Sequence, residues 1–418
     1  MAKRMCLALA GTPSVLLFHL ADDSSSSEDD DDGPAYEAMF RELFDAPCAV
    51  PKVKEYVLTV VNAYSDNEFR RNFRLARVPC YDLIDQFEGS SFFSSTSHHG
   101  GSPTKTAEEH ILSFCHNLCR TLQLNVAPLH LFRYVANKSS MRECALLFNM
   151  ADSMLAVIDR VLNFLCSIAL AIICFAADKG ALANGLKKRA GFPNVIGCID
   201  GTYIPTRCPN SKTRSTYINR HDQVSITMQG IRDAKGRFQD VFTGPPSKVH
   251  DARVLRLSVV QQDLPTICAV NKYHLLGDAA YPIREHLLTP FKNYGTMTKA
   301  KVEYNQRHAS TRVVIENTFG MMKQRFRQLR YVEFTTVDKI TQLIIWCCVS
   351  HNICMDAGDM SVEDILTDEK RRERREDIAL HARKSRAELE AVRQPRTARD
   401  NVLRQLGEAK RNTIAQLF

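Results

Sequence analysis

The stretch LLGDAAYPI, residues 275–283, decides how this chain folds, because its apolar run delivers a single carboxylate to a turn. A short apolar run that is closed by Gly, Asp or Pro predicts a strand followed by a turn. Asp278 then stands directly behind the strand. In an open sheet, functional side chains collect at one edge beyond the strand ends. The chain therefore needs to be searched for further acids in the same setting.

A second acid, Asp200, has that setting, and a third acid differs from both. Asp200 ends the apolar run of NVIGCIDGTYI (194–204) and precedes Gly201. Two strands that each end in an acid can bring their carboxylates together. Glu316 lies instead in the helical run RVVIENTFG (312–320), among Val, Ile and Phe residues. Because a bare buried charge is costly, Glu316 must be paired, exposed at a rim or bound to a cation.

The surrounding sequence predicts an α/β domain over residues 191–356. Runs rich in β-branched and aromatic residues at 194–209, 223–244 and 272–282 read as strands, and RDAKGRF (232–238) predicts a hairpin. Residues 249–262 and 310–332 have helical spacing of their apolar side chains. Strands followed by helices in this order are typical of α/β folds.

The rest of the chain divides into three further segments. Residues 1–65 hold the acidic tract DDSSSSEDDDD (22–32) and are expected to be disordered. Residues 66–190 are expected to be all-α, with a helix-turn-helix-like pair signalled by Ser140 and Glu143 as a capping box. A plain helical hairpin is the alternative, because Arg160 is the only basic residue early in the second helix. Residues 357–418 form a charged C-terminal tail, expected as an exposed helix or a disordered segment.

Composition limits the classes of function. The net charge of +8 favours anionic partners such as nucleic acid without establishing one. The 14 cysteines lie in apolar segments and do not form a disulfide framework, which indicates an intracellular protein with reduced thiols. Cys347, His351 and Cys354 could hold zinc, but a packed helix face explains them better. The apolar run 161–177 is borderline for crossing a bilayer, and a buried helix is favoured.

Three converging carboxylates are what a two-metal phosphoryl-transfer site needs. Their oxygens suit Mg²⁺ or Mn²⁺, and two such ions activate the attacking oxygen and stabilise the leaving oxygen. The sequence contains no nucleophile elbow, P-loop or dinucleotide fingerprint. The acids therefore predict metal-dependent chemistry that needs no side-chain nucleophile.

Residues near the acids suggest supporting roles. Asp251 either supports the site from behind or caps the helix that follows, and capping is the stronger interpretation. His250 could assist proton movement or be structural. Arg312, Lys323, Arg325 and Arg327 share the helical run with Glu316 and are candidates for holding DNA phosphates. The alternative is a solvated basic face.

Several motifs together resemble one known family. NVIGCIDGTYI (194–204), VHDARVL (249–255), LLGDAAYPI (275–283), RVVIENTFGMMKQRFRQL (312–329) and CCVSHNIC (347–354) occur in the order seen in the DDE domain of Harbinger (PIF) transposases and nucleases derived from them. The helical segments 69–84 and 133–159 also resemble that family. The resemblance covers residues 66–356, and it is specific because the motifs occur in register.

The resemblance implies an RNase H-like (retroviral-integrase-like) fold with Asp200, Asp278 and Glu316 as the catalytic, metal-binding triad. The 37 residues between Asp278 and Glu316 are similar to the family's usual spacing. One departure is Ala279, where relatives frequently have Ser after the acid. It bears on fine tuning rather than on the class of chemistry.

From these observations we expect a DNA endonuclease of the nucleus that uses two Mg²⁺ or Mn²⁺ ions, with the cytoplasm as a second location. The segment KRRERRE (370–376) could serve as a nuclear address or be a solvated face. The family resemblance implies a separate Myb-like DNA-binding partner; no membrane partner is expected, and the oligomeric state stays open. The alternatives are a catalytically silent DNA-binding or scaffold protein, and a phosphohydrolase acting on small substrates.

Overall fold

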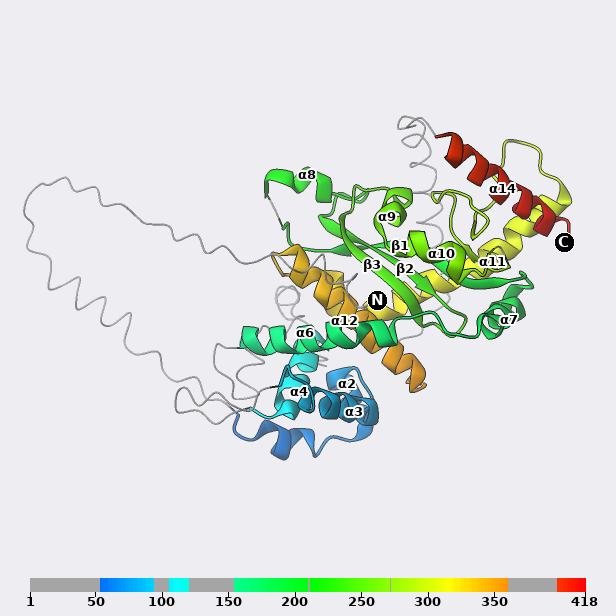
Figure 1. Ribbon diagram of the computed structural model, residues 1–418. Helices are drawn as coiled ribbons and strands as arrows, with labels where there is room; N and C mark the ends of the chain where they lie inside the picture. The colour runs from blue at the N-terminus through cyan, green and yellow to red at the C-terminus, as the bar shows by residue number, and fades with distance from the viewer. Residues whose placement is uncertain (1–52, 94–104, 120–153, 210, 271, 360–396) are drawn as a thin grey trace, which may run out of the picture.

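A computed structural model describes residues 53–93, 105–119, 154–209, 211–270, 272–359 and 397–418 (Figure 1). The acidic tract, the predicted Ser140–Glu143 capping box and the basic segment 370–376 lie outside these residues.

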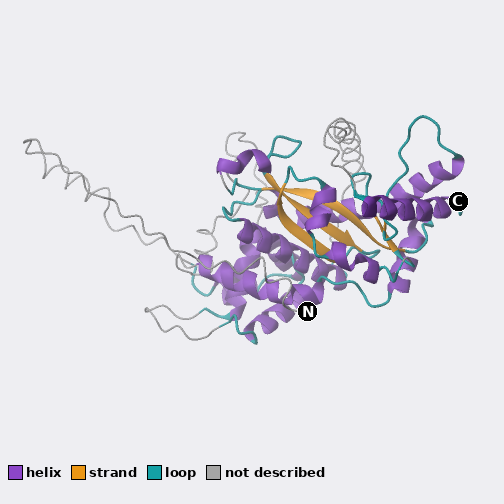
Figure 2. Cartoon of the chain, turned by 45° about the horizontal axis from the view of Figure 1, so that its top comes forward, coloured by secondary structure: helices purple, strands orange, loops and turns teal. Residues whose placement is uncertain are grey.

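A mixed sheet forms the centre of the described chain (Figure 2). Its order is β3-β2-β1-β4-β5, in which β1, β2 and β3 are antiparallel neighbours, β4 is parallel to β1, and β5 is parallel to β4. The strands are β1 Val195–Pro205, β2 Ser225–Arg232, β3 Phe238–Pro246, β4 His274–Leu276 and β5 Leu287–Leu288. The predicted hairpin is confirmed between β2 and β3, where Gly236 adopts φ +99°, a conformation open to glycine without strain.

Helices cover both faces of this sheet, so the predicted α/β organisation is confirmed. On one face, Ile199 and Ile231 pack with side chains from α7 (Lys179–Ala190), α9 (Asp251–Leu257) and α10 (Val260–Ile267). On the other, Cys198 and Met228 join the core of α11 (Lys299–Arg325) and α12 (Val337–Asp356). Shorter elements complete the domain: η3 Ser211–Thr213, α8 Arg214–Tyr217 and η4 Arg327–Arg330.

The helical region precedes the sheet and packs against α12. It comprises η2 Val57–Val61, α2 Asp66–Phe73, α3 Arg77–Glu88, α4 Ala107–Cys119 and α6 Met154–Ile172. In α2, Ser65 and Glu68 form a reciprocal capping box, and Phe69 and Phe73 are fully buried. Figure 1 shows α2, α3 and α4 grouped at one end of the molecule, with α6 running beside α12.

Helix α6 is part of the protein core. Val161, Leu162, Phe164 and Leu165 are buried in the same cluster as the apolar side chains of α12. Across the described residues, no helix has the length and apolar character that crossing a bilayer requires. The buried-helix interpretation of the run 161–177 is confirmed for its first part, whereas α6 ends at Ile172 and Leu170 and Cys174 are exposed.

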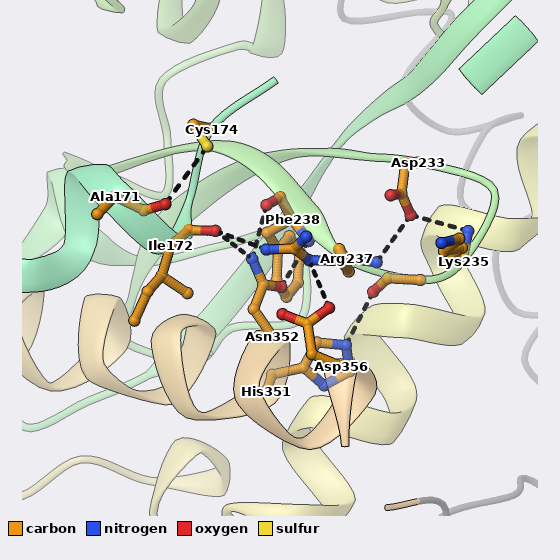
Figure 3. A network of polar contacts seen from close by, with 11 residues as sticks. Ala171, Ile172, Cys174, Asp233, Lys235, Arg237, Phe238, His351, Asn352 and Asp356 are labelled. Atoms are coloured by element: carbon orange, nitrogen blue, oxygen red, sulfur yellow. Dashed lines mark hydrogen bonds and ion pairs between the residues drawn. The ribbon is translucent and has the colours of Figure 1, made fainter. Parts of the chain in front are cut away.

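The HNIC segment of α12 is structural (Figure 3). Asn352 accepts a hydrogen bond from the main-chain N–H of Phe238 (2.8 Å) and donates to the carbonyls of Phe238 (2.8 Å) and Ile172 (3.1 Å). His351 Nε2 lies 2.9 Å from the carbonyl oxygen of Gly236. One buried amide thus joins α6, β3 and α12. His351 contacts the β2–β3 hairpin, and Cys347 and Cys354 are buried in the core. These contacts favour the interpretation of a packed helix face over that of a zinc site.

The C-terminal helix α14 (Ala398–Ala415) is largely exposed, as one of the two expectations had it, but one face of it is docked on the sheet domain. Lys410 donates to the carbonyls of Tyr273 and Glu285, and Arg411 donates to those of Thr289 and Pro290. Charges that look solvated in the sequence therefore cap main-chain groups around β5. Sequence periodicity could not reveal this, since the contacts are to backbone atoms distant in the chain.

Candidate active site

The parallel pairing of β1 with β4 sets the geometry of the site. Cys198 is in register with Leu276, and Asp200 and Asp278 each lie two residues beyond that pair. Neighbouring strands are about 4.8 Å apart, and residues two apart point to the same face. The two acids therefore occupy equivalent positions along adjacent chain segments, on the face covered by α11.

The sequence suggested that Asp200 ends its strand, but the structure places it in the middle of β1. Strand β1 continues to Pro205 because β2 remains its partner, and Asp200 pairs with Gly230 in mid-strand. Only β4 stops, at Leu276. The edge at which the acids meet is thus formed by the short strand, and the long strand runs past it.

Asp278 sits in a tight turn that holds its carboxylate. Oδ1 accepts a hydrogen bond from the N–H of Ala280 (2.9 Å). Burial raises the pKa of Asp278, and the nearby carboxylate of Asp200 raises it further, against the opposing effects of Arg312 and main-chain N–H groups. Two like charges in one buried place favour a proton or a cation between them.

Arg312 joins the other two acids. Its Nη1 donates to Asp200 Oδ2 (2.7 Å), and its Nη2 donates to Glu316 Oε1 (2.6 Å). The side chains of Arg312, Asp200 and Glu316 are only 17%, 15% and 14% exposed. Burial alone would lower the pKa of Arg312, but attraction to Asp200, Glu316 and Asp278 outweighs it and raises that pKa. Arg312 is therefore permanently charged inside the site.

Asp251 approaches the site from the other face of the sheet. The N-cap of α9 is His250, so the capping interpretation of Asp251 is wrong. A Cβ at Gly201 would lie 2.7 Å from Asp251 Oδ1, so the carboxylate of Asp251 lies against the backbone of β1 next to Asp200. Burial, Asp278 and Asp200 raise the pKa of Asp251 to about 7. The carboxylate therefore shares the field of the two strand acids, while His250 is exposed.

The four predicted DNA-binding cations have different surroundings. Lys323 Nζ donates to Thr202 Oγ1 and to the carbonyl of Tyr203, both at 2.7 Å, on the same strand as Asp200. Arg325 is 3% exposed and forms an ion pair with Asp359, a position unsuited to a phosphate contact. Arg327 is half-buried in η4. Arg312 faces the acids.

Glu316 is therefore held through Arg312 and does not share a cluster with both strand acids. Within the part of the chain that the structure describes, no three His, Cys, Asp or Glu side chains are close enough together to hold a metal ion. The structure brings Asp200 and Asp278 together, adds Asp251, and places an arginine between Asp200 and Glu316.

The part of the chain that contains these acids matches the model of a known protein family. The model of the family described as DDE superfamily endonuclease matches residues 199–352, which contain all four acids. This segment is a DDE superfamily endonuclease domain.

The DDE domain also has relatives among curated proteins. The protein named "Putative nuclease HARBI1" is 30% identical over 232 residues in Homo sapiens and 31% identical over 233 residues in Mus musculus; each match covers 53% of this chain and 60% of the relative. "Protein ALP1-like" of Arabidopsis thaliana is 26% identical over 198 residues, which cover 44% of this chain and 48% of that protein. The chain thus spans less than two thirds of these relatives. No solved structure matches it.

Sequence reasoning missed two parts of the DDE domain's site. It took Arg312 for a phosphate-binding cation, although the four-residue spacing to Glu316 is a signal for an ion pair on one helix face. It also passed over Tyr281, which is 4% exposed and whose pKa is raised well above its ordinary value by burial and by Asp251, Asp200 and Asp278. Its side chain packs with Ile199, Leu255 and Leu264 on the α9 and α10 side of the sheet.

Proposed function

We propose that the DDE domain is a divalent-metal-dependent DNA endonuclease in which Asp200 and Asp278 hold Mg²⁺ or Mn²⁺ and Glu316 completes the site. The observation that carries the proposal is the equivalent register of the two aspartates beyond Cys198 and Leu276. Endonucleases of this superfamily use divalent metals. Two ions, as in other phosphodiester-cleaving sites, are part of the proposal.

Asp200 and Asp278 fit such an ion, because Mg²⁺ is usually held by one or two carboxylates while water and phosphate oxygens complete its shell. Carboxylate oxygens are the ligands that Mg²⁺ and Mn²⁺ prefer. Burial and the charge of Asp200 raise the pKa of Asp278, so a cation between them relieves a repulsion that the fold imposes. Glu316 is one ion pair away, on the far side of Arg312. The donor set supports the proposal, with Glu316 joining once Arg312 moves.

Bound divalent ions would activate the attacking water or 3′ hydroxyl and stabilise the leaving oxygen of the phosphodiester. The chain's own groups supply the rest. The main-chain N–H groups of Gly201 and Ala280 orient the Asp200 and Asp278 carboxylates. Tyr281 is buried on the α9 and α10 side of the sheet, within the electrostatic influence of the same acids.

Nucleic acid as the substrate is supported by charge near the acids. Lys323 lies beside β1, and Arg220 lies over the Tyr203 ring, 5.6 Å from its centroid. With a net charge of +8, the chain carries the excess that phosphate contacts need. We assign DNA positioning to Lys323 and Arg327 and leave Arg325 out of the interface.

The remaining parts of the proposal concern the whole protein. An RNase H-like fold is supported by the strand order β3-β2-β1-β4-β5 with helix α11 following β5. A helix-turn-helix role for residues 66–190, a nuclear location, a separate Myb-like DNA-binding partner and an oligomeric state are carried forward from the sequence as expectations.

Plasmid nicking tests the proposed function. The full chain is incubated with supercoiled plasmid in Mg²⁺, in Mn²⁺ and in EDTA. We expect nicking in either metal, no nicking in EDTA, and a loss of at least about 100-fold in Asp278→Asn, because the metal loses a charged ligand. Asp240→Asn is the matched control: Asp240 is an acid on β3 whose pKa burial raises to about 7, and it lies outside the site.

A catalytically silent DNA-binding protein is the second candidate. The Arg312 bridge favours it, since an arginine that neutralises two acids is also what an inactive site would contain. Plasmid that stays supercoiled in both metals, with DNA binding retained, would decide for this candidate.

A further inference from the structure

Arg312 lies between Asp200 and Glu316, and it donates hydrogen bonds to carboxylate oxygens that a metal ion would use as ligands. Asp200 Oδ1 is taken by the N–H of Gly201 (2.9 Å), and Oδ2 is taken by Arg312 Nη1 (2.7 Å). The second guanidinium nitrogen holds Glu316 (2.6 Å). A divalent ion shared by Asp200 and Glu316 has to compete with this guanidinium.

We propose that Arg312 is an internal counter-cation that bridges Asp200 and Glu316 in the metal-free protein and is displaced when a divalent ion binds. The inference rests on the proposed function. It makes Arg312 a positioning residue that sets metal affinity, in place of a phosphate-binding residue on the surface.

The geometry favours displacement over a permanent bridge. Arg312 and Glu316 lie one turn apart on α11, so their pair is local to the helix and survives if the guanidinium swings away from β1. The bond to Asp200 crosses from helix to strand, and it is the one that closes the metal position. Rotation of one flexible side chain can therefore open the site without moving α11.

Repulsion among the buried acids explains why an arginine bridges Asp200 and Glu316. Asp200, Asp278 and Asp251 all contribute to the same field, and burial removes the water that would screen them. A buried cation offsets this repulsion when no metal is present. The same guanidinium then lowers apparent metal affinity, because only the fraction of molecules with the bridge open can bind.

Mn²⁺ binding to the full chain, measured by isothermal titration calorimetry without DNA, tests the inference in the wild type and in the variants Arg312→Lys and Arg312→Gln. Lysine keeps the charge but replaces the planar fork, which holds one carboxylate with each of two nitrogens, by a single compact ammonium. If the bridge blocks the site, both variants bind Mn²⁺ about 10- to 100-fold more tightly, the ratio expected for losing charge-assisted hydrogen bonds.

Arg307→Lys is the matched control. Arg307 lies on the same helix and forms the same kind of four-residue pair, with Glu303 at 2.7 Å, away from the acids. Its substitution is expected to leave Mn²⁺ affinity unchanged. Thermal unfolding adds an independent readout: both Arg312 variants should melt below wild type in EDTA and gain more from Mn²⁺ than wild type does.

The outcomes separate the two proposals. If wild type binds Mn²⁺ and Arg312→Lys binds equally tightly, Arg312 acts through its charge or not at all, and the displaced bridge is wrong while the metal site stands. If neither the wild type nor either variant binds Mn²⁺ at millimolar concentration, the metal-dependent function fails and the inference fails with it.

Discussion

Asp359 shows how much one residue contributes beyond the site. It is 7% exposed, forms ion pairs with Arg325 and Arg70, and accepts a hydrogen bond from the N–H of Ala76 (3.1 Å). It thereby ties the helical region to the end of α11. Arg325 is buried, so water cannot replace Asp359 as its partner. Removing Asp359 therefore leaves the positive charge of Arg325 buried without its carboxylate.

The change Asp359→Ala is expected to lower the free energy of unfolding by about 3–5 kcal/mol. Chemical denaturation of the full chain measures it. Asp356→Ala is the comparison, because Asp356 also pairs with an arginine, Arg237, but its side chain is 53% exposed. That pair should contribute about 0–1 kcal/mol. Equal losses in the two variants would show that Arg325 finds other compensation.

At the scale of elements, α14 depends on one close approach. A Cβ at Gly407 would lie 2.8 Å from the Cα and C atoms of Arg284, which are backbone and cannot move aside cheaply. The ion pair of Arg284 with Asp400 (2.8 Å) holds the same contact from the start of the helix. Glycine therefore allows α14 to lie against the chain beside β5.

The change Gly407→Ala should destabilise the protein by about 1–3 kcal/mol through this overlap, although alanine favours an isolated helix by about 1 kcal/mol. Gln405→Ala, at an exposed position of α14, is the control and should be neutral or slightly stabilising. Thermal unfolding of both variants measures the difference. A Gly407→Ala protein at least as stable as wild type would mean that α14 is not docked as described.

Some of the strands and helices could be predicted from the sequence, and others could not. The runs around Asp200, Ile231 and Leu276 are recognisable as strands because β-branched residues end at Gly or Asp. The start of α11 at Lys299 was missed, since its first turns carry polar residues that lack an apolar stripe. Strand β5, of two residues, is too short to have a pattern. Register between β1 and β4 leaves no local signal in the sequence.

For the whole molecule, the sequence predicted that Asp200 and Asp278 would meet, and their meeting follows from the parallel register of β1 and β4. It did not predict that Arg312 would stand between Asp200 and Glu316. The direction in which an arginine points on a helix depends on which face the sheet covers, and that is a tertiary property. The central claim is accordingly the shared position of the two aspartates.

Crystals of the full chain grown with Mn²⁺ test that claim most directly, by the anomalous signal of manganese. We predict a peak within about 2.0–2.3 Å of carboxylate oxygens from both Asp200 and Asp278, with the Arg312 guanidinium moved off Asp200. An anomalous map without a peak between these two aspartates at saturating Mn²⁺, and with Arg312 still bridging Asp200 and Glu316, would contradict the account.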